Sequence, residues 1–265
     1  MIKLIATDMD GTWLTDQKTY DQELFLQEFQ IMQKKGIKFV VASGNQFENL
    51  YSRFPQVANQ LFYIAENGAL VAQGKQVIHV DCLSEKDWQT IMKIIQESNE
   101  KVTVSGLASA YILKKDGPEY AKELKKYYEK LTVVESFNHL DDQIFKVTFD
   151  VAENKMPHLL EKLRRNYPEI DFVSGSSSSI DMSTKGMNKA KGLQFLSSKF
   201  KINPKEMVTF GDSGNDVGML KYAGTSYATG TALPVAKKAA THIIGSSNDS
   251  AVQKEIWRLL NQKNK

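Results

Sequence analysis

The sequence has little of what a secreted or membrane protein needs. Cys82 is the single cysteine among 265 residues, so no disulfide can form within the chain. No apolar run approaches the ~20 residues of a membrane helix, and the N-terminus lacks the layout of a signal peptide. We therefore expect a cytoplasmic protein that does not act at a membrane.

A strong excess of charge of one sign is also missing. The chain has 34 Lys and Arg residues against 31 Asp and Glu, which gives a formal net charge of +3. The basic residues are scattered, with only short clusters such as Lys114-Lys115. This distribution is typical of solvated surfaces and not of a nucleic-acid-binding stripe. We expect no nucleic-acid partner, whereas a small phosphorylated metabolite is compatible with the charge.

Short apolar runs and amphipathic segments alternate near both ends of the chain. Between the runs, Phe25, Phe29 and Met32 follow helical spacing, and Gly36 stands where that helix would end. Such alternation predicts parallel βαβ units in one sheet. The six runs expected to be strands are residues 3–7, 39–42, 62–65, 208–210, 225–228 and 242–244.

The middle of the chain has a different pattern of apolar and polar residues. Ser84 stands where it can cap a helix, and residues 144–149 alternate as a half-buried antiparallel strand does. A second helical pattern ends near Tyr167-Pro168, and strand-like segments follow it. We predict an α/β fold in which a Rossmann-like, parallel-sheet core receives an inserted α+β domain. The predicted boundaries are 1–82 with 184–265 for the core and 83–183 for the insertion.

Polar residues that can carry chemistry stand directly after predicted strands or at the start of a predicted helix. In open α/β sheets, sites form where the carboxyl ends of the strands meet their loops, so we expect these residues to converge. Carboxylates gathered there repel one another unless a cation lies among them. Oxygen ligands without nearby His or Cys favour Mg²⁺ over Zn²⁺. The clusters are Asp8 with Asp10, Ser43-Gly44-Asn45, Lys189, and Asp212 with Asn215 and Asp216.

This combination of groups is suited to phosphoryl transfer. A carboxylate such as Asp8 can act as the nucleophile and form an aspartyl-phosphate. Asp10 lies two residues away, on the same side of an extended segment, where it can protonate the leaving oxygen and later activate water. The phosphoryl oxygens can be stabilised by the Lys189 ammonium, the Ser43 hydroxyl and the backbone N–H groups of Gly44 and Asn45.

The motifs also resemble those of a known family. Asp8-Met9-Asp10-Gly11-Thr12 resembles the first motif of the haloacid dehalogenase (HAD) superfamily of phosphohydrolases, and Val41-Ala42-Ser43-Gly44 resembles the second. Gly186-Met187-Asn188-Lys189 resembles the third, and Gly211-Asp212-Ser213-Gly214-Asn215-Asp216 the fourth. The insertion is similar to the cap of the Cof-type (type IIB cap) subfamily. With Ala65-Glu66-Asn67-Gly68-Ala69, the likeness covers essentially the whole chain, and bacterial sugar-phosphatases match most closely.

The resemblance implies roles for the residues around the metal. Asp8 would be the nucleophile and a Mg²⁺ ligand. Asp10 would be the general acid/base and a second ligand through its backbone carbonyl. Asp212 would complete the metal site. Asp216 would not bind the metal itself but would orient the residues that do.

Other residues are assigned to the phosphate by the same resemblance. Ser43 and Lys189 would hold the transferring phosphoryl group together with the backbone at Gly44, and Asn215 would orient it. Asn45 departs from the pattern, because many relatives have Arg or another residue after the Ser-Gly pair. This departure does not affect the expected mechanism. It does mean that the substrate contacts of relatives cannot be assigned in detail to this chain.

We therefore predict a magnesium-dependent phosphoric monoester hydrolase, with sugar phosphates implied by the resemblance alone and the insertion setting specificity. We expect a monomer or a weak homo-oligomer. Two alternatives stay open. A receiver-type signalling module also phosphorylates an Asp beside Mg²⁺ and Lys, but it is far shorter and has no inserted domain. A non-catalytic phosphosugar-binding or regulatory protein on the same fold is the second alternative, although every catalytic position is filled here.

Overall fold

The computed structural model describes residues 1–128 and 130–262 of the chain. The chain folds into two compact units, which we call the core unit (Met1–His79 with Asn188–Lys265) and the inserted unit (Val80–Met187). The predicted insertion, residues 83–183, lies within the second of these. In the described part of the chain, no helix is both long enough and apolar enough to cross a membrane.

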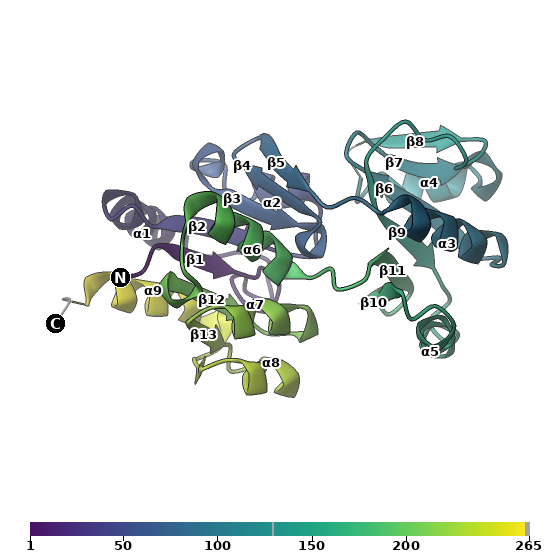
Figure 1. Ribbon diagram of the computed structural model, residues 1–265. Helices are drawn as coiled ribbons and strands as arrows, with labels where there is room; N and C mark the ends of the chain where they lie inside the picture. The colour runs from purple at the N-terminus through teal and green to yellow at the C-terminus, as the bar shows by residue number, and fades with distance from the viewer. Residues whose placement is uncertain (129, 263–265) are drawn as a thin grey trace. The chain divides into compact units, whose positions relative to one another are not determined.

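An eight-stranded sheet forms the centre of the core unit (Figure 1). The strands from β14 to β3 pair in parallel, whereas β4 is antiparallel to β3 and β5 follows at the edge. All six apolar runs expected to be strands belong to this sheet, which confirms the predicted α/β class; β4 and β5 were not predicted. In order across the sheet the strands are β14 (His242–Ile243), β13 (Thr225–Ala228), β12 (Met207–Gly211), β1 (Leu4–Thr7), β2 (Lys38–Ala42), β3 (Phe62–Ala65), β4 (Leu70–Gln73) and β5 (Gln76–Val80).

Both faces of this sheet are covered by helices. Side chains alternate along a strand, so Ile5 packs on the face that carries α1 and α9, while Leu4 and Ala6 pack on the face that carries α6. Burial on both faces explains why the parallel strands read as continuous apolar runs. The helices of the core unit are α1 (Gln22–Lys34), α2 (Phe47–Ser52), α6 (Lys189–Phe200), α7 (Val217–Tyr222), α8 (Pro234–Ala239) and α9 (Ala251–Asn261).

The inserted unit is built on a six-stranded sheet. β9 lies at its centre and pairs antiparallel with both β6 and β11. Ser84 caps α3 as predicted, since its side chain accepts a hydrogen bond from the Asp87 backbone N–H. The strands in order are β10 (Ile170–Ser176), β11 (Ser179–Thr184), β9 (Ile144–Asp150), β6 (Lys101–Gly106), β7 (Ala110–Leu113) and β8 (Leu131–Val134); the helices are α3 (Glu85–Gln96), α4 (Pro118–Leu124) and α5 (Met156–Asn166).

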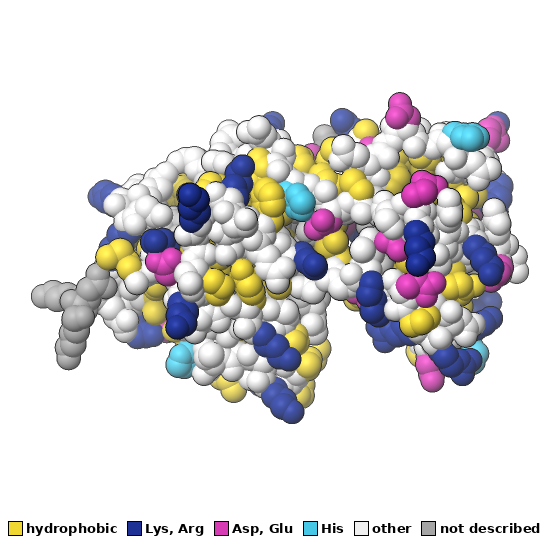
Figure 2. All heavy atoms as spheres, viewed as in Figure 1, with side chains coloured by type: hydrophobic (Ala, Val, Ile, Leu, Met, Phe, Trp, Pro, Cys, Tyr) yellow, Lys and Arg dark blue, Asp and Glu magenta, His cyan; other side chains and the backbone are white. Residues whose placement is uncertain are grey.

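Helices cover the two faces of the inserted unit's sheet unequally. Side chains from α3 and α5, among them Ile91 and Leu163, pack with one face in a single apolar cluster. On the other face, Tyr120 and Leu124 of the short helix α4 pack against Ile112. On the visible surface of this unit, acidic and basic side chains are interspersed (Figure 2). The two apolar clusters give the inserted unit, an α+β fold, a hydrophobic core of its own.

Candidate active site

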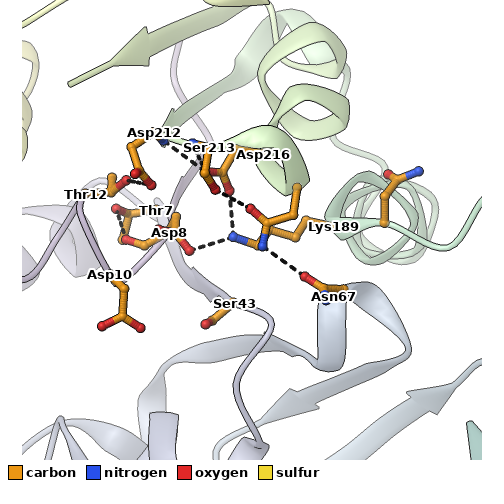
Figure 3. Close-up of polar contacts among 12 residues, drawn as sticks. Thr7, Asp8, Asp10, Thr12, Ser43, Asn67, Lys189, Asp212, Ser213 and Asp216 are labelled. Carbon is orange, nitrogen blue, oxygen red and sulfur yellow. Dashed lines mark hydrogen bonds and ion pairs between the residues drawn. The ribbon is translucent and has the colours of Figure 1, made fainter. Parts of the chain in front are cut away.

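Three neighbouring parallel strands of the core unit end at the same edge of the sheet. β1 lies between β12 and β2, and their last residues are Thr7, Gly211 and Ala42. The loops that follow begin with the three predicted clusters at Asp8, Asp212 and Ser43. Helix α6 begins at Lys189 and places the fourth cluster among them (Figure 3). Parallel pairing therefore brings together segments that lie far apart in the sequence.

Lys189 lies at the centre of this arrangement. Its ammonium is 2.6 Å from Oδ1 of Asp8 and 2.6 Å from Oδ1 of Asp216. Both Lys189 and Asp216 are fully buried, and Asp8 is 5% exposed. Burial by itself lowers the pKa of Lys189, but the two carboxylates raise it above its ordinary value, so the side chain stays an ammonium.

Asp216 also shapes the loop that carries Asp212. Its Oδ2 accepts hydrogen bonds from the backbone N–H groups of Asp212 at 2.9 Å and of Ser213 at 3.0 Å. Thr12 Oγ1 donates to Asp212 Oδ1 at 3.1 Å. At Gly11, φ is +78°, and a Cβ there would lie 2.6 Å from Asp212 Oδ2, so this position excludes a side chain.

The acidic groups outnumber the ammonium. Carboxylate oxygens of Asp8, Asp212 and Asp216 lie within 4.8 Å of one another. Burial raises the pKa of Asp8 to about 8, although Lys189 acts in the opposite direction, and burial followed by repulsion from Asp216 raises the pKa of Asp212. A divalent cation among oxygen ligands would reverse these shifts. The donor set therefore fits Mg²⁺, and Asp8 and Asp212 are close enough to share one ion.

Asp10 occupies a more open position than Asp8. One oxygen accepts a hydrogen bond from the Lys18 ammonium at 2.6 Å, and the other accepts one from Nδ2 of Asn45 at 3.0 Å. Partial burial raises the pKa of Asp10, but Lys18 and Asn45 outweigh it, and the net pKa lies below the ordinary value. Lys18 was not predicted as a site residue, because it lies in a turn eight positions after Asp10 and belongs to no motif.

The phosphate-binding candidates lie in two further groups. Ser43 is buried, and its Oγ accepts a hydrogen bond from the Asn45 backbone N–H at 3.1 Å. Asn215 accepts a hydrogen bond from Ser213 Oγ at 2.6 Å and donates one to Oδ1 of Asn67 at 3.0 Å. In the sequence, Asn67 belongs only to the segment Ala65–Ala69 that carries part of the family resemblance, and the motifs predict no role for it.

The structure thus places every predicted site residue at one edge of the core sheet. Direct contacts connect Asp8, Lys189, Asp216 and the Asp212 backbone, while Asp10 pairs with Asn45. The roles assigned to these residues stay predictions. The partners that sequence reasoning missed are Thr12, Lys18 and Asn67.

A model of the haloacid dehalogenase-like hydrolase family matches residues 5–256. The chain therefore belongs to the haloacid dehalogenase-like hydrolase family, which confirms the resemblance on which the motifs were aligned. The receiver-type alternative does not fit a chain that carries this family's fold over nearly its whole length.

Similar proteins are named as phosphatases. The 5-amino-6-(5-phospho-D-ribitylamino)uracil phosphatase YbjI of Escherichia coli is 38% identical over 262 residues, which cover 98% of this chain and 96% of that protein. YcsE of Bacillus subtilis, which bears the same enzyme name, is 25% identical and covers 96% of this chain and 94% of its own length. These names agree with the predicted phosphoric monoester hydrolase.

Solved structures share the fold. A protein from Streptococcus mutans is 31% identical with a TM-score of 0.85, over 99% of this chain and 100% of that chain. A structure described as a HAD subclass IIB sugar phosphatase is 20% identical with a TM-score of 0.77, over 97% of this chain and 98% of that chain. The second likeness concerns the fold alone.

Proposed function

We propose that this protein is a magnesium-dependent phosphatase that hydrolyses small phosphate monoesters through an aspartyl-phosphate on Asp8. One observation carries the proposal: a buried carboxylate, Asp8, lies 2.6 Å from the Lys189 ammonium and within 4.8 Å of the Asp212 carboxylate. A nucleophile, a positive charge for the phosphoryl oxygens and a second metal ligand therefore occupy one place.

In the first step, an oxygen of Asp8 attacks phosphorus, and the bond between phosphorus and the leaving oxygen breaks. Asp10 gives its proton to that oxygen, so the alcohol leaves neutral. In the second step, Asp10 takes a proton from water, which attacks the phosphorus of the phosphorylated Asp8. Orthophosphate leaves and Asp8 is regenerated. The contacts to Lys18 and Asn45 favour the carboxylate that the second step needs, and they must weaken when Asp10 is protonated for the first.

Positive and hydrogen-bonding groups surround the position where the phosphoryl group would lie. Lys189 is fixed between two carboxylates, so its ammonium needs no reorganisation when charge develops on the phosphoryl oxygens. The Ser43 hydroxyl and the backbone N–H of Gly44 are the proposed donors from the second loop, and Asn215 is the proposed donor from the fourth.

The carboxylates of Asp8 and Asp212 would hold Mg²⁺, with the backbone carbonyl of Asp10 as the proposed third ligand. When bound, the ion would neutralise charge on the phosphoryl oxygens and keep Asp8 ionised as a nucleophile. Asp216 is committed to Lys189 and to two backbone N–H groups, so we assign it a supporting role and not a place in the coordination shell.

For the substrate, we propose a phosphorylated metabolite with a polyhydroxylated leaving group. The sequence resemblance favours sugar phosphates. The two relatives named above act, by their names, on a ribityl phosphate, which is also a phosphate ester of a polyhydroxylated chain. The specificity role of residues 83–183 belongs to the same proposal.

The test is a phosphate-release screen on the purified protein. It would compare sugar phosphates, nucleotides, cofactor phosphates and 5-amino-6-(5-phospho-D-ribitylamino)uracil, each with Mg²⁺ or with EDTA. We expect turnover of one or more polyol or sugar phosphates, its loss in EDTA and its recovery when Mg²⁺ is restored. Binding of these compounds without release would instead support the non-catalytic alternative. Equal turnover in EDTA would contradict the proposed metal dependence.

A further inference from the structure

A strained turn lies directly beside the proposed phosphate site. Residues Glu66–Gly68 connect β3 to β4, and their φ angles are +51°, +56° and +109° in succession. Glycine adopts positive φ freely and Asn does so more readily than most residues, whereas Glu rarely adopts it. The positive φ of Glu66 therefore indicates that the surroundings, and not local preference alone, impose this conformation.

Backbone hydrogen bonds join this turn to the second motif. The Asn67 N–H donates to the Ser43 carbonyl at 3.1 Å, and the Glu66 N–H donates to the Asn45 carbonyl at 3.1 Å. The turn therefore forms hydrogen bonds with both ends of the Ser43–Asn45 loop, which is proposed to hold the phosphoryl group.

The side chain of Asn67 connects the same loop to the fourth motif. Its Oδ1 accepts a hydrogen bond from Nδ2 of Asn215 at 3.0 Å, across 148 positions of sequence. The Asn67 amide also lies against Gly44, where a Cβ would be 3.0 Å from Oδ1. Figure 3 shows Asn67 on the side of the site that holds Ser43 and Lys189.

The last residue of the turn contacts the third motif. A Cβ on Gly68 would lie 2.2 Å from the backbone carbonyl oxygen of Asn188, the residue that caps α6 directly before Lys189. Only glycine allows this approach. The turn at residues 66–68 thus contacts all three segments that the proposed mechanism uses to hold phosphate.

We propose that Asn67 is a positioning residue: its side-chain amide fixes Asn215 and supports the Ser43–Asn45 loop, so that the phosphate-holding groups are arranged before the substrate arrives. This inference rests on the proposed function, because it concerns the same site. Fixing Asn215 leaves its orientation independent of the substrate, which reduces the ordering that binding must produce.

The variant Asn67→Gly distinguishes the effect of the side-chain amide from the effect of the backbone conformation. Glycine removes the side chain but adopts positive φ freely, so the variant keeps the turn and relieves its strain. Lys201→Gly is the matched control, since Lys201 is exposed, ends α6 at φ +54° and has no place in the site. Both variants relieve the backbone, and only the first removes an amide from the site.

We expect Asn67→Gly to raise KM and the inhibition constant of inorganic phosphate by about tenfold or more, with a smaller change in kcat. A lost hydrogen bond that orients a group on a charged ligand weakens binding by about this factor. Lys201→Gly should leave both constants unchanged. If Asn67→Gly has wild-type constants and only a higher melting temperature, the amide has no positioning role and the inference fails.

A double-mutant cycle with Asn215→Ala tests whether Asn67 acts through Asn215. We expect Asn67→Gly to add little in the Asn215→Ala background, because the interaction is already lost. Fully additive effects would contradict the proposed route. If Asn67→Gly does not fold, Asn67→Asp gives a second test: its negative charge should weaken phosphate binding, and wild-type affinity would place Asn67 outside the phosphate site.

The two proposals fail in different ways. Binding of inorganic phosphate by titration calorimetry needs no turnover, so it measures the effect of Asn67→Gly even in a protein that releases no phosphate. Absence of turnover in the wild-type protein with every ester would refute the proposed function. Unchanged phosphate affinity in Asn67→Gly would refute the positioning role.

Discussion

The core unit buries carboxyl groups in two places that are built differently. At the edge of the sheet, Asp8 and Asp216 share the Lys189 ammonium at 2.6 Å each. Between α1 and α9, Glu28 is fully buried near Gln253 and the Trp257 backbone, and within the described residues neither of its oxygens has a well-formed hydrogen bond. The first place is an ionic network, and the second holds a single acidic group in an apolar contact between helices.

A paired buried carboxylate and an unpaired buried carboxyl group have different effects on a protein. A buried charge persists only when it is paired. At the sheet edge Lys189 pairs with Asp8 and Asp216, and a divalent cation bound there would keep Asp8 ionised. Burial, with a smaller contribution from Asp21, raises the pKa of Glu28 to about 9, so that carboxyl is neutral at pH 7. We therefore expect Glu28 to act on the free energy of unfolding, while Asp8 is proposed to act in catalysis.

The largest effect is expected from Asp8→Asn. An amide is not a nucleophile for phosphorus, so phosphate release should fall to background with every substrate. The fold should survive, because Lys189 keeps its contact with Asp216. Steady-state phosphate release measures the first expectation and circular dichroism the second. Activity within tenfold of the wild type would show that Asp8 is not the nucleophile.

Asp10→Asn should lower kcat by about 10²–10⁴-fold, the usual contribution of a general acid/base. KM should change little, because Asp10 is proposed to act on the leaving oxygen and on water and not on the phosphoryl oxygens. The measurement is kcat and KM on the best substrate from the screen. Near-normal kcat would remove Asp10 from the mechanism.

Lys189→Met tests the network as a structural element. Loss of one partner of a buried ion pair leaves uncompensated charge, so we expect a loss of about 3–5 kcal/mol in the free energy of unfolding. Urea denaturation at pH 7 in EDTA measures it. Lys191→Met on the same helix is the control, because Lys191 is exposed and should change stability by less than about 0.5 kcal/mol. Equal stability of the two variants would mean that the network contributes nothing.

At acidic pH, where the Glu28 carboxyl is neutral in the folded and the unfolded chain, Glu28→Gln should have the smallest effect of these changes, and the effect should grow as pH rises. The pKa of Glu28 is higher in the folded protein than in the unfolded chain, so the folded state binds more protons between the ordinary value of 4.5 and about 9. Stability from this group is fully present below pH 4.5 and falls as pH rises toward 9, by at most about 1.4 kcal/mol per pH unit.

Glutamine is neutral at every pH, so Glu28→Gln should flatten this dependence and raise the melting temperature at pH 8 more than at pH 5. Glu23→Gln, an exposed change on the same helix, should not alter the profile. Parallel pH profiles for the wild type and Glu28→Gln would show that Glu28 is not held neutral by the fold.

The strands of the core unit were predictable because parallel strands are buried on both faces. Their runs are continuous and apolar, and each ends in a polar cluster that the sheet must bring to one edge. The strands β4 and β5 were missed because an antiparallel edge hairpin carries a weaker pattern. In the inserted unit, β9 was predicted from its alternation, while β6, β7 and β8 were not predicted.

The motifs predicted which residues come together in the site but not which of them contact one another. Asp216 was expected behind the metal ligands, and its contact with Lys189 comes from a helix that begins 27 positions earlier. Lys18 and Asn67 carried no signal of a role, because a lysine in a turn and an Asn-Gly pair are common on surfaces.

The sequence by itself determined the fold class, the family and which motif residues are candidates for the site, since periodicity and local motifs are properties of neighbouring positions. The tertiary structure decided which charges are paired, which carboxyl group is neutral and which amide orients another. Those outcomes depend on burial and on contacts between residues far apart in the sequence, such as Asp8 and Lys189, which are separated by 181 positions. Such contacts exist only once the chain has folded.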